Sequence, residues 1–247
     1  MLKVRKSGER GYFDHGWLKT HHTFSFGDYI DRHQMAFRNL RVINEDFVAG
    51  GHGFGMHPHR DMEILTYIVS GALEHKDSMG NCGVIRPGEV QYMSAGTGVL
   101  HSEANPLPDE VCHLLQIWIL PRESGLAPAY DQRPIGGGSM ASPMVLVAAP
   151  DDDSDCGNGI AIRADVRLYA GKIPSSTVHE LKLRHGYGWF QLVKGEVEVV
   201  GGDGGDGGAI AMGPGDGLAI SHEVSIRIKV LGSSGQESAE ALFFDLS

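Results

Sequence analysis

Two short histidine-containing segments are the residues of this chain best suited to chemistry. His57-Pro58-His59 comes first, and His101-Ser102-Glu103 follows later in the same half of the chain. In an extended strand alternate side chains point to the same face, so each segment can direct two donor groups into one cavity. Three imidazoles and a carboxylate suit a divalent transition metal such as iron, with coordination positions left for other ligands. The alternative is a pair of surface strands with solvated imidazoles, in a chain that contains 13 histidines.

Glycines recur at fixed distances around both segments. The first lies in the pattern G-x5-H-x-H-x3-E-x7-G, which begins at Gly51, and the second in G-x-G-x2-H-x3-N, which begins at Gly96. These patterns resemble the paired motifs of the cupin superfamily, whose small antiparallel barrels hold a metal between strands. There are two departures from those motifs. The gap between the glutamate and the last glycine of the first pattern is one residue longer than in those motifs, and Gly96 stands where the second motif usually has proline.

Two glutamates compete to be the carboxylate ligand. Glu63 occupies the position that usually supplies it in cupins, whereas Glu103 lies beside His101 on the second segment. Only one carboxylate is needed, so the motifs leave both candidates open.

Within that superfamily, the residues around the motifs resemble the pirin family. The matching stretches are GWL at 16–18, HHTFSF at 21–26, FRNLRV at 37–42, HPHR at 57–60, GTGVLHSE at 96–103, LQIW at 115–118 and PAY at 128–130. They are dense over about the first 130 residues and sparse afterwards. The resemblance implies a metal held by His57, His59, His101 and Glu103 in the first of two cupin barrels, with Glu63 in a supporting structural role.

The resemblance also implies an activity. Pirin-like proteins of this kind use dioxygen to open the central ring of a flavonol such as quercetin, with release of carbon monoxide. In that reaction we expect Glu103 to be both ligand and proton acceptor. Fe(II) is the expected metal, although Mn, Ni, Cu and Zn also accept imidazole ligands.

Two other functions remain open from the sequence. One is a non-enzymatic, iron-dependent redox sensor or regulatory protein that binds a protein partner. The other is a different metal-dependent reaction on a small organic acid or phenol.

The composition predicts an all-β fold. The chain has 247 residues with 35 Gly and 11 Pro, and it contains many short alternating or β-branched segments and few runs with helical periodicity. Short strands separated by glycine and proline are typical of sandwiches and barrels. The length is sufficient for two barrels, each with a core of its own.

An internal repeat supports two tandem cupin barrels. IVSGALE at 68–74 followed by RPGEV at 86–90 is similar to LVKGEVE at 192–198 followed by GPGDG at 213–217. The second copy lacks a counterpart of the His-Pro-His segment. We therefore expect residues 1–125 to form an N-terminal metal-binding barrel, and residues 126–247 to form a linker and a C-terminal barrel without a metal site.

Two polar or glycine-rich segments of the second half are interpreted as loops. The aspartate-rich stretch 151–159 has some likeness to a calcium loop, but an acidic surface turn is the simpler interpretation. The glycine-rich run 201–208 lacks the Lys-Ser/Thr pair and the helix that follow in a phosphate-binding loop, so it is predicted to be the tip of a hairpin.

Charge and cysteine content limit which binding partners and which cellular compartment the sequence predicts. Three widely spaced cysteines indicate neither a disulfide framework nor a structural zinc site. No segment approaches the ~20 apolar residues of a membrane span, and the N-terminus does not look like a secretion signal. A formal net charge of −10 disfavours direct binding to nucleic acid. These features predict a cytoplasmic protein whose partners are an aromatic substrate and dioxygen.

Overall fold

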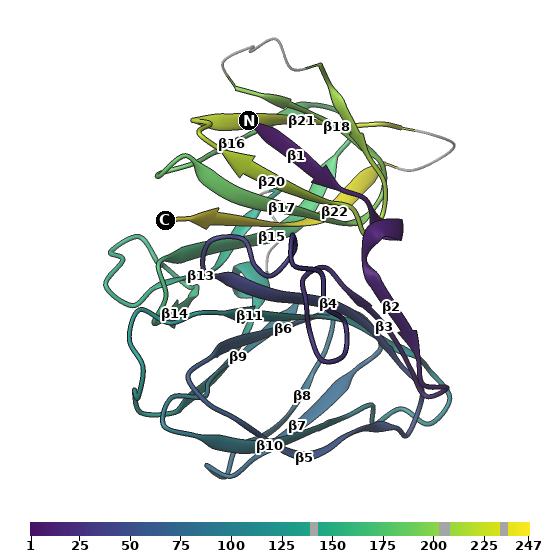
Figure 1. The fold of residues 1–247 in the computed structure, drawn as a ribbon, viewed down its shortest axis with the longest axis vertical. Coiled ribbons are helices and arrows are strands. Elements are labelled where there is room, and N and C mark those ends of the chain that lie inside the picture. Colours follow the sequence, from purple (N-terminus) through teal and green to yellow (C-terminus); the bar gives the residue numbers. More distant parts are fainter. Residues whose placement is uncertain (139–142, 203–207, 233–236) are drawn as a thin grey trace.

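The structure consists of β-strands, as the sequence predicts. A computed structural model describes residues 1–138, 143–202, 208–232 and 237–247, and these contain two short 3-10 helices and no α-helix. The glycine-rich hairpin tip predicted within 201–208 falls largely outside these ranges. The strands form two barrels stacked along the long axis of the molecule, each made of a seven-stranded and a four-stranded sheet (Figure 1). The prediction of two tandem cupin barrels is confirmed.

The first barrel contains the histidine segments. Its seven-stranded sheet has the order β12 (Ala129–Pro134), β9 (Glu89–Ser94), β6 (Glu63–Ser70), β11 (Cys112–Ile119), β4 (Leu40–Val48), β3 (Leu18–His22) and β2 (Gly11–Asp14). Its four-stranded sheet has the order β5 (Gly53–His59), β10 (Val99–Ala104), β7 (Leu73–Asp77) and β8 (Cys82–Ile85).

The second barrel repeats this plan. Its seven-stranded sheet has the order β1 (Leu2–Arg5), β20 (Gly217–Ser221), β17 (Tyr187–Lys194), β22 (Ser238–Leu246), β15 (Val166–Pro174), β13 (Val145–Pro150) and β14 (Ile160–Ile162). Its four-stranded sheet has the order β16 (Val178–Lys182), β21 (Ser225–Val230), β18 (Val197–Gly201) and β19 (Ile210–Met212).

The two halves exchange edge strands. The N-terminal strand β1 pairs with β20 of the second barrel, and β12 pairs with β9 of the first. The first barrel therefore includes a strand that follows residue 125, and the second barrel includes a strand that precedes it. The division of the chain at residue 125 into two folding units remains a prediction.

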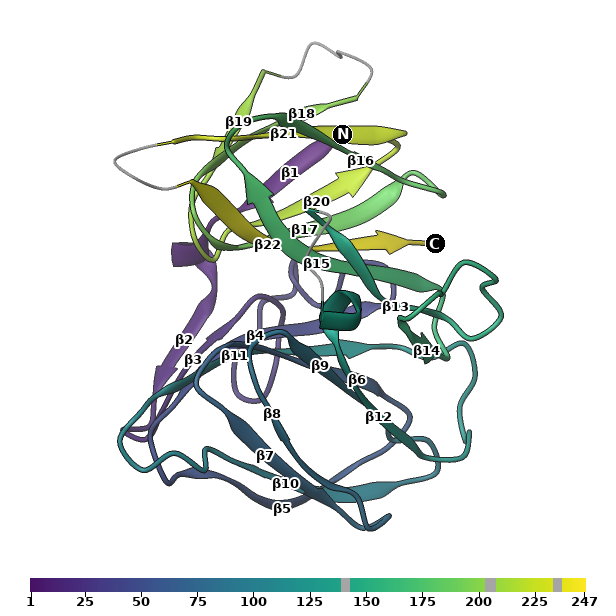
Figure 2. The same ribbon diagram turned by 180° about the vertical axis from the view of Figure 1, so that it is seen from behind.

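The two seven-stranded sheets lie against each other in the middle of the molecule, with the four-stranded sheets outside (Figures 1 and 2). The largest apolar cluster spans this contact, joining Leu65 and Leu115 of the first barrel to Leu168 and Phe244 of the second. The interior of the second barrel is filled by another cluster, which includes Phe190, Leu192, Val197, Ile226 and Phe243. In the first barrel the large sheet turns the residues of the largest cluster outward, and a smaller apolar cluster that includes Ile68 and Leu114 fills part of the interior. The rest of its inward face is free to carry polar groups.

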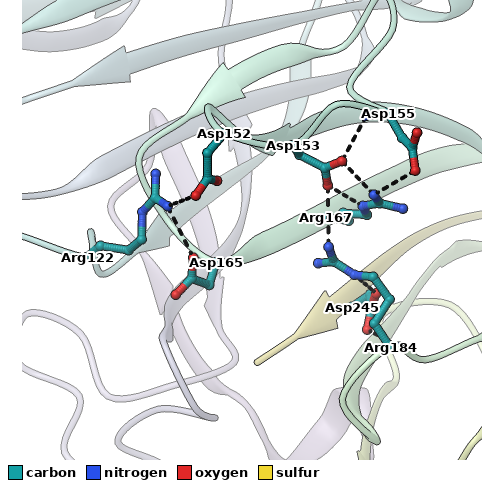
Figure 3. A network of polar contacts seen from close by, with 8 residues as sticks. All are labelled: Arg122, Asp152, Asp153, Asp155, Asp165, Arg167, Arg184 and Asp245. Carbon is teal, nitrogen blue, oxygen red and sulfur yellow. Dashed lines mark hydrogen bonds and ion pairs between the residues drawn. The ribbon is translucent and has the colours of Figure 1, made fainter.

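The aspartate-rich loop 151–159 is held by arginines (Figure 3). Asp153 accepts hydrogen bonds from Arg167 at 2.5 and 2.6 Å and from Arg184 at 3.3 Å. Arg184 also donates to Asp245 of β22 at 2.7 Å, and Arg122 pairs with the start of the loop. The carboxylates thus anchor the loop to β15 and β22, in agreement with the acidic-turn interpretation.

A buried ion pair lies on the outward side of β4. Glu45 lies 2.8 Å from Nη1 of Arg10 and 2.8 Å from Nε2 of His113. Burial alone would raise the pKa of Glu45, but the hydrogen bond from His113 and the charge of Arg10 outweigh burial and lower this pKa to about 2.

We predict that the Glu45→Gln substitution lowers the free energy of unfolding by about 2–3 kcal/mol at pH 7. Because the folded-state pKa of Glu45 is depressed, its contribution is complete above the unfolded-state pKa and is lost as the pH falls toward 2. Urea unfolding at pH 7, 4 and 2.5 should therefore show the difference between wild type and variant shrinking as the pH falls. A constant difference over this range would contradict the assignment.

Candidate metal centre

Strand pairing brings the two histidine segments together. β5 and β10 are antiparallel neighbours, and His101 lies directly opposite His57. The ring centroids are 4.4 Å apart for His57 and His101, 4.7 Å for His59 and His101, and 4.8 Å for His57 and His59. The nitrogens that would coordinate a metal all lie within 4.8 Å of one another. A register irregularity after His101 then sets the position of Glu103 on the same strand.

The hydrogen bonds of these imidazoles leave nitrogens available to a metal. Nδ1 of His57 lies 2.8 Å from the carbonyl oxygen of Gly55, so it donates there and leaves Nε2 with a lone pair. His101 is 1% exposed, and its Nε2 has no hydrogen-bond partner among the described residues. A buried imidazole nitrogen without a partner is costly unless something else binds it. This orphaned atom beside two further imidazoles fits a divalent metal.

The electrostatics of the cluster favour the metal-binding form of histidine. Burial and, to a smaller extent, the neighbouring His57 together lower the pKa of His59 to about 4. Burial first, and then the neighbouring His57 and His59, together lower the pKa of His101 to about 3. Both rings are therefore neutral at pH 7, which is the protonation state that coordinates metals.

Glu103 lies in the same cavity but has different close neighbours. Its carboxylate is 4% exposed and accepts hydrogen bonds from Nε2 of Gln116 at 3.1 and 3.2 Å. The structure groups it with His101 and His75, within 4.8 Å, rather than with all three clustered histidines. Burial raises the pKa of Glu103 to about 7; the Gln116 hydrogen bond opposes this shift.

Glu63, the other candidate for the carboxylate ligand, forms its hydrogen bonds with groups outside the histidine cluster. It accepts hydrogen bonds from Tyr92 at 2.5 Å, from Ser94 at 2.6 Å and from the backbone N–H of Arg163 at 2.9 Å. These contacts link β6 and β9 to the second half of the chain. Glu63 is not among the residues that line the histidine cavity, which agrees with a structural role.

Sequence reasoning assigned no role to His75, which lies behind His101. His75 is fully buried; its Nε2 lies 3.1 Å from Asp77, and its Nδ1 lies 3.2 Å from Gln91 and 3.4 Å from Nδ1 of His101. In the arrangement that fits these contacts, His75 donates from Nε2 to Asp77, and the lone pair on its Nδ1 is shared between Nε2 of Gln91 and Nδ1 of His101 as donors. That tautomer leaves Nε2 of His101 with a lone pair that a metal could bind. The His-x-Asp alternation on one strand was the available signal, but nothing in the sequence indicated its distance from His101.

The cluster lies at the wall of a cavity of about 440 Å³, a volume typical of small-molecule sites. Its other walls are largely aromatic, and Trp118 packs edge-on against His59 with a centroid distance of 4.8 Å. The lining residues are Trp17, Phe26, Asn44, Asp46, Gly53, Phe54, Gly55, His57, His59, Glu103, Leu114, Gln116 and Trp118. The cavity therefore suits a flat, largely apolar molecule with polar groups near the histidines.

Two stacked cupin barrels with a histidine cluster in the first define a bicupin protein. Residues 3–119 match the family model described as Pirin, and residues 146–246 match the model described as Quercetinase C-terminal cupin domain. The chain belongs to the pirin family, as its motifs indicated.

The relatives are similar over the whole chain. A quercetin 2,3-dioxygenase of Escherichia coli strain K12 is 42% identical, with 100% of this chain and 99% of the relative covered. A pirin-like protein of Caulobacter vibrioides is 39% identical, with 99% of each chain covered. The expected likeness to quercetin 2,3-dioxygenases is thus confirmed.

Solved structures of related proteins have the same fold over the whole chain. The crystal structure of YhhW from Escherichia coli has a TM-score of 0.88 and 41% identity, covering 100% of this chain and 98% of that one. The same bacterial pirin in complex with nickel(II) has a TM-score of 0.86 and 41% identity, covering 100% and 99%. Separately, among the described residues no helix has the length and apolar character needed to cross a membrane.

We predict that His101→Ala removes stoichiometric metal from the purified protein, because it deletes the buried nitrogen at the centre of the cluster. Elemental analysis measures the metal content. Thermal unfolding should show that added metal raises the melting temperature of the wild type but not of the variant, since a ligand stabilises only the state that binds it. His185→Ala, an exposed histidine of the second barrel, serves as the control. Unchanged metal content in His101→Ala would contradict the site.

The contact between His75 and His101 generates a second prediction. His75→Phe preserves a buried ring beside Tyr130, with which His75 stacks at 5.0 Å, but removes the partner of His101 Nδ1. We expect metal affinity to fall roughly 10–100-fold, as for other groups that orient a ligand. Competition with a chromophoric chelator measures the dissociation constant. An affinity equal to that of the wild type would show that His75 only fills space.

Proposed function

We propose that this protein is a metal-dependent dioxygenase that uses dioxygen to open the central ring of a flavonol such as quercetin. The observation that carries the proposal is the orphaned Nε2 of His101 within a three-histidine cluster, at the wall of an aromatic cavity. Full-length similarity to a quercetin 2,3-dioxygenase supports the substrate class.

We assign His57, His59, His101 and Glu103 as the metal ligands. The three imidazoles supply neutral nitrogen donors, and Glu103 supplies one negative charge on the same strand as His101. Fe(II) is the metal we propose. Nickel is the first alternative, because a related pirin has been crystallised with nickel(II), and Mn, Cu and Zn follow since each accepts this donor set.

The chain's own residues would bind, orient and deprotonate the substrate. When bound, the metal supplies positive charge that stabilises a substrate hydroxyl in its deprotonated form. Glu103 accepts that proton on a carboxylate oxygen, and Gln116 keeps the carboxylate in place through Nε2. Trp118 and Phe54 form flat walls that hold the planar substrate and exclude water from the reacting carbons.

We propose that the second barrel has a structural role and holds no metal. Its interior is filled by large apolar side chains, including Phe190 and Phe243. Its seven-stranded sheet covers the apolar outer face of the first barrel, which supports this role.

The proposal predicts dioxygen consumption and carbon monoxide release when the metal-loaded protein is mixed with quercetin. Glu103→Gln should reduce the rate at least about a hundredfold, because it removes the proton acceptor while preserving side-chain size. An oxygen electrode and gas analysis measure the two quantities, and His185→Ala should retain the wild-type rate. No oxygen uptake by the metal-loaded wild type would exclude the dioxygenase, and partner binding that depends on the metal's redox state would then favour the sensor.

A further inference from the structure

A second, more polar chamber adjoins the histidine cavity. It has a volume of about 200 Å³ and is lined by residues that include Phe13, Leu18, Thr20 and His22. Four residues, Phe26, Asn44, Asp46 and Phe54, line both spaces. The two volumes are therefore neighbours that share part of their walls.

Strand register places four polar side chains on the wall of this chamber. Thr20 of β3 lies opposite Asp46 of β4, and His22 lies opposite Asn44. Alternation along each strand turns these four to the inner face of the sheet, while Glu45 between them faces outward. Their exposed fractions are 3% for Thr20, 7% for His22, 4% for Asn44 and 5% for Asp46.

Two of these side chains have atoms that nothing in the described chain satisfies. Nδ1 of His22 and Oδ1 of Asn44 are buried, with no hydrogen-bond partner among the described residues. The hydroxyl of Thr20 donates to the Asp46 carboxylate opposite it, which leaves the lone pairs of the Thr20 oxygen free to accept. Buried polar groups in folded proteins are normally paired, so unpaired atoms beside a chamber call for a ligand. Glu45 on the opposite face shows the normal situation, since both of its oxygens are paired.

The chemistry of the wall defines the group that would fit. Oδ1 of Asn44 and Oδ1 of Asp46 accept hydrogen bonds, and the hydroxyl of Thr20 can accept one too. The occupant must therefore present donors, and the Asp46 carboxylate disfavours a carboxylate or phosphate group. Phe26 contacts one residue in each space. The centroid of its ring lies 5.2 Å from that of Trp118 in the histidine cavity and 5.2 Å from that of His22 in the chamber, and the rings meet edge-on in both cases. Such walls suit a flat ring that carries hydroxyl groups.

We infer that this chamber is a specificity subsite that binds the hydroxylated pendant ring of the substrate, while the ring that reacts lies at the histidine cluster. The inference rests on the proposed function for the location of the reacting ring. It adds that hydroxyl groups far from the metal determine which aromatic substrates this protein accepts, because a site built to pair with hydroxyls rejects analogues that lack them.

The test compares quercetin with galangin, a flavonol that lacks the pendant-ring hydroxyls but is otherwise identical. Binding is measured by quenching of tryptophan fluorescence in nickel(II)-loaded protein without dioxygen, so no turnover is needed; Trp17 and Trp118 line the cavity. We expect the wild type to bind quercetin at least about tenfold more tightly than galangin.

Two variants remove chamber groups without changing their size greatly. Thr20 lines the second chamber alone, so Thr20→Val should reduce the preference for quercetin by about tenfold, through weaker quercetin binding and unchanged galangin binding. Asn44 also lines the histidine cavity, so Asn44→Leu should weaken quercetin binding about tenfold more than it weakens galangin binding. Thr20→Ser retains the hydroxyl and should retain the preference. Thr177→Val makes the same change as Thr20→Val on an exposed turn of the second barrel and should alter neither affinity. Circular dichroism and metal content confirm that each variant is folded and loaded.

The possible outcomes separate this inference from the dioxygenase proposal. A preference for quercetin that Thr20→Val abolishes, in a protein that consumes no oxygen, would support the subsite and exclude the dioxygenase. Oxygen consumption with equal affinity for both flavonols, or a preference that neither variant changes, would overturn the subsite and leave the dioxygenase standing. If neither quercetin nor galangin binds, the subsite is overturned as well.

Discussion

The pairing of β5 with β10 is the constraint on which the rest of the site depends. It places His101 opposite His57 and brings three imidazoles from two distant segments within reach of one point. Because side chains alternate along a strand, a shift of one residue in this register would turn the imidazoles of one strand to the opposite face. The buried Nε2 of His101 is stable in this position only if it has a partner, and a metal is the partner that its neighbours suit.

The stacking of the two barrels explains how a cupin interior can hold so many polar groups. The large sheet of the first barrel gains its apolar burial on its outer face, against the second barrel. Its inner face therefore carries a polar row across four neighbouring strands, with Thr66, Gln116, Asn44 and His22 in register. One end of this row positions Glu103 through Gln116, which itself accepts from Thr66 at 2.8 Å.

The two ends of that polar row differ in what they contact. Around Glu103 and His101 the groups are paired with one another, which fixes the geometry of the proposed ligands before any metal or substrate binds. Around His22 and Asn44 the groups are unpaired and face a chamber. Rigid support near the histidines and unsatisfied acceptors farther away are the arrangement expected of a site that reacts at one end of a molecule and recognises the other.

The sequence by itself determined the all-β class, the two barrels and the family, because these follow from local patterns: glycine and proline spacing, alternation, and the motifs around His57 and His101. It could not choose between Glu63 and Glu103 from the motifs alone, nor show that His75 lies against His101. Only the tertiary structure showed that Glu63 forms its hydrogen bonds outside the histidine cavity, that His75 lies against His101, and that the unpaired atom of Asn44 lies beside a chamber. Contacts between strands depend on register and on how sheets stack, and neither is encoded in the spacing of residues along one segment.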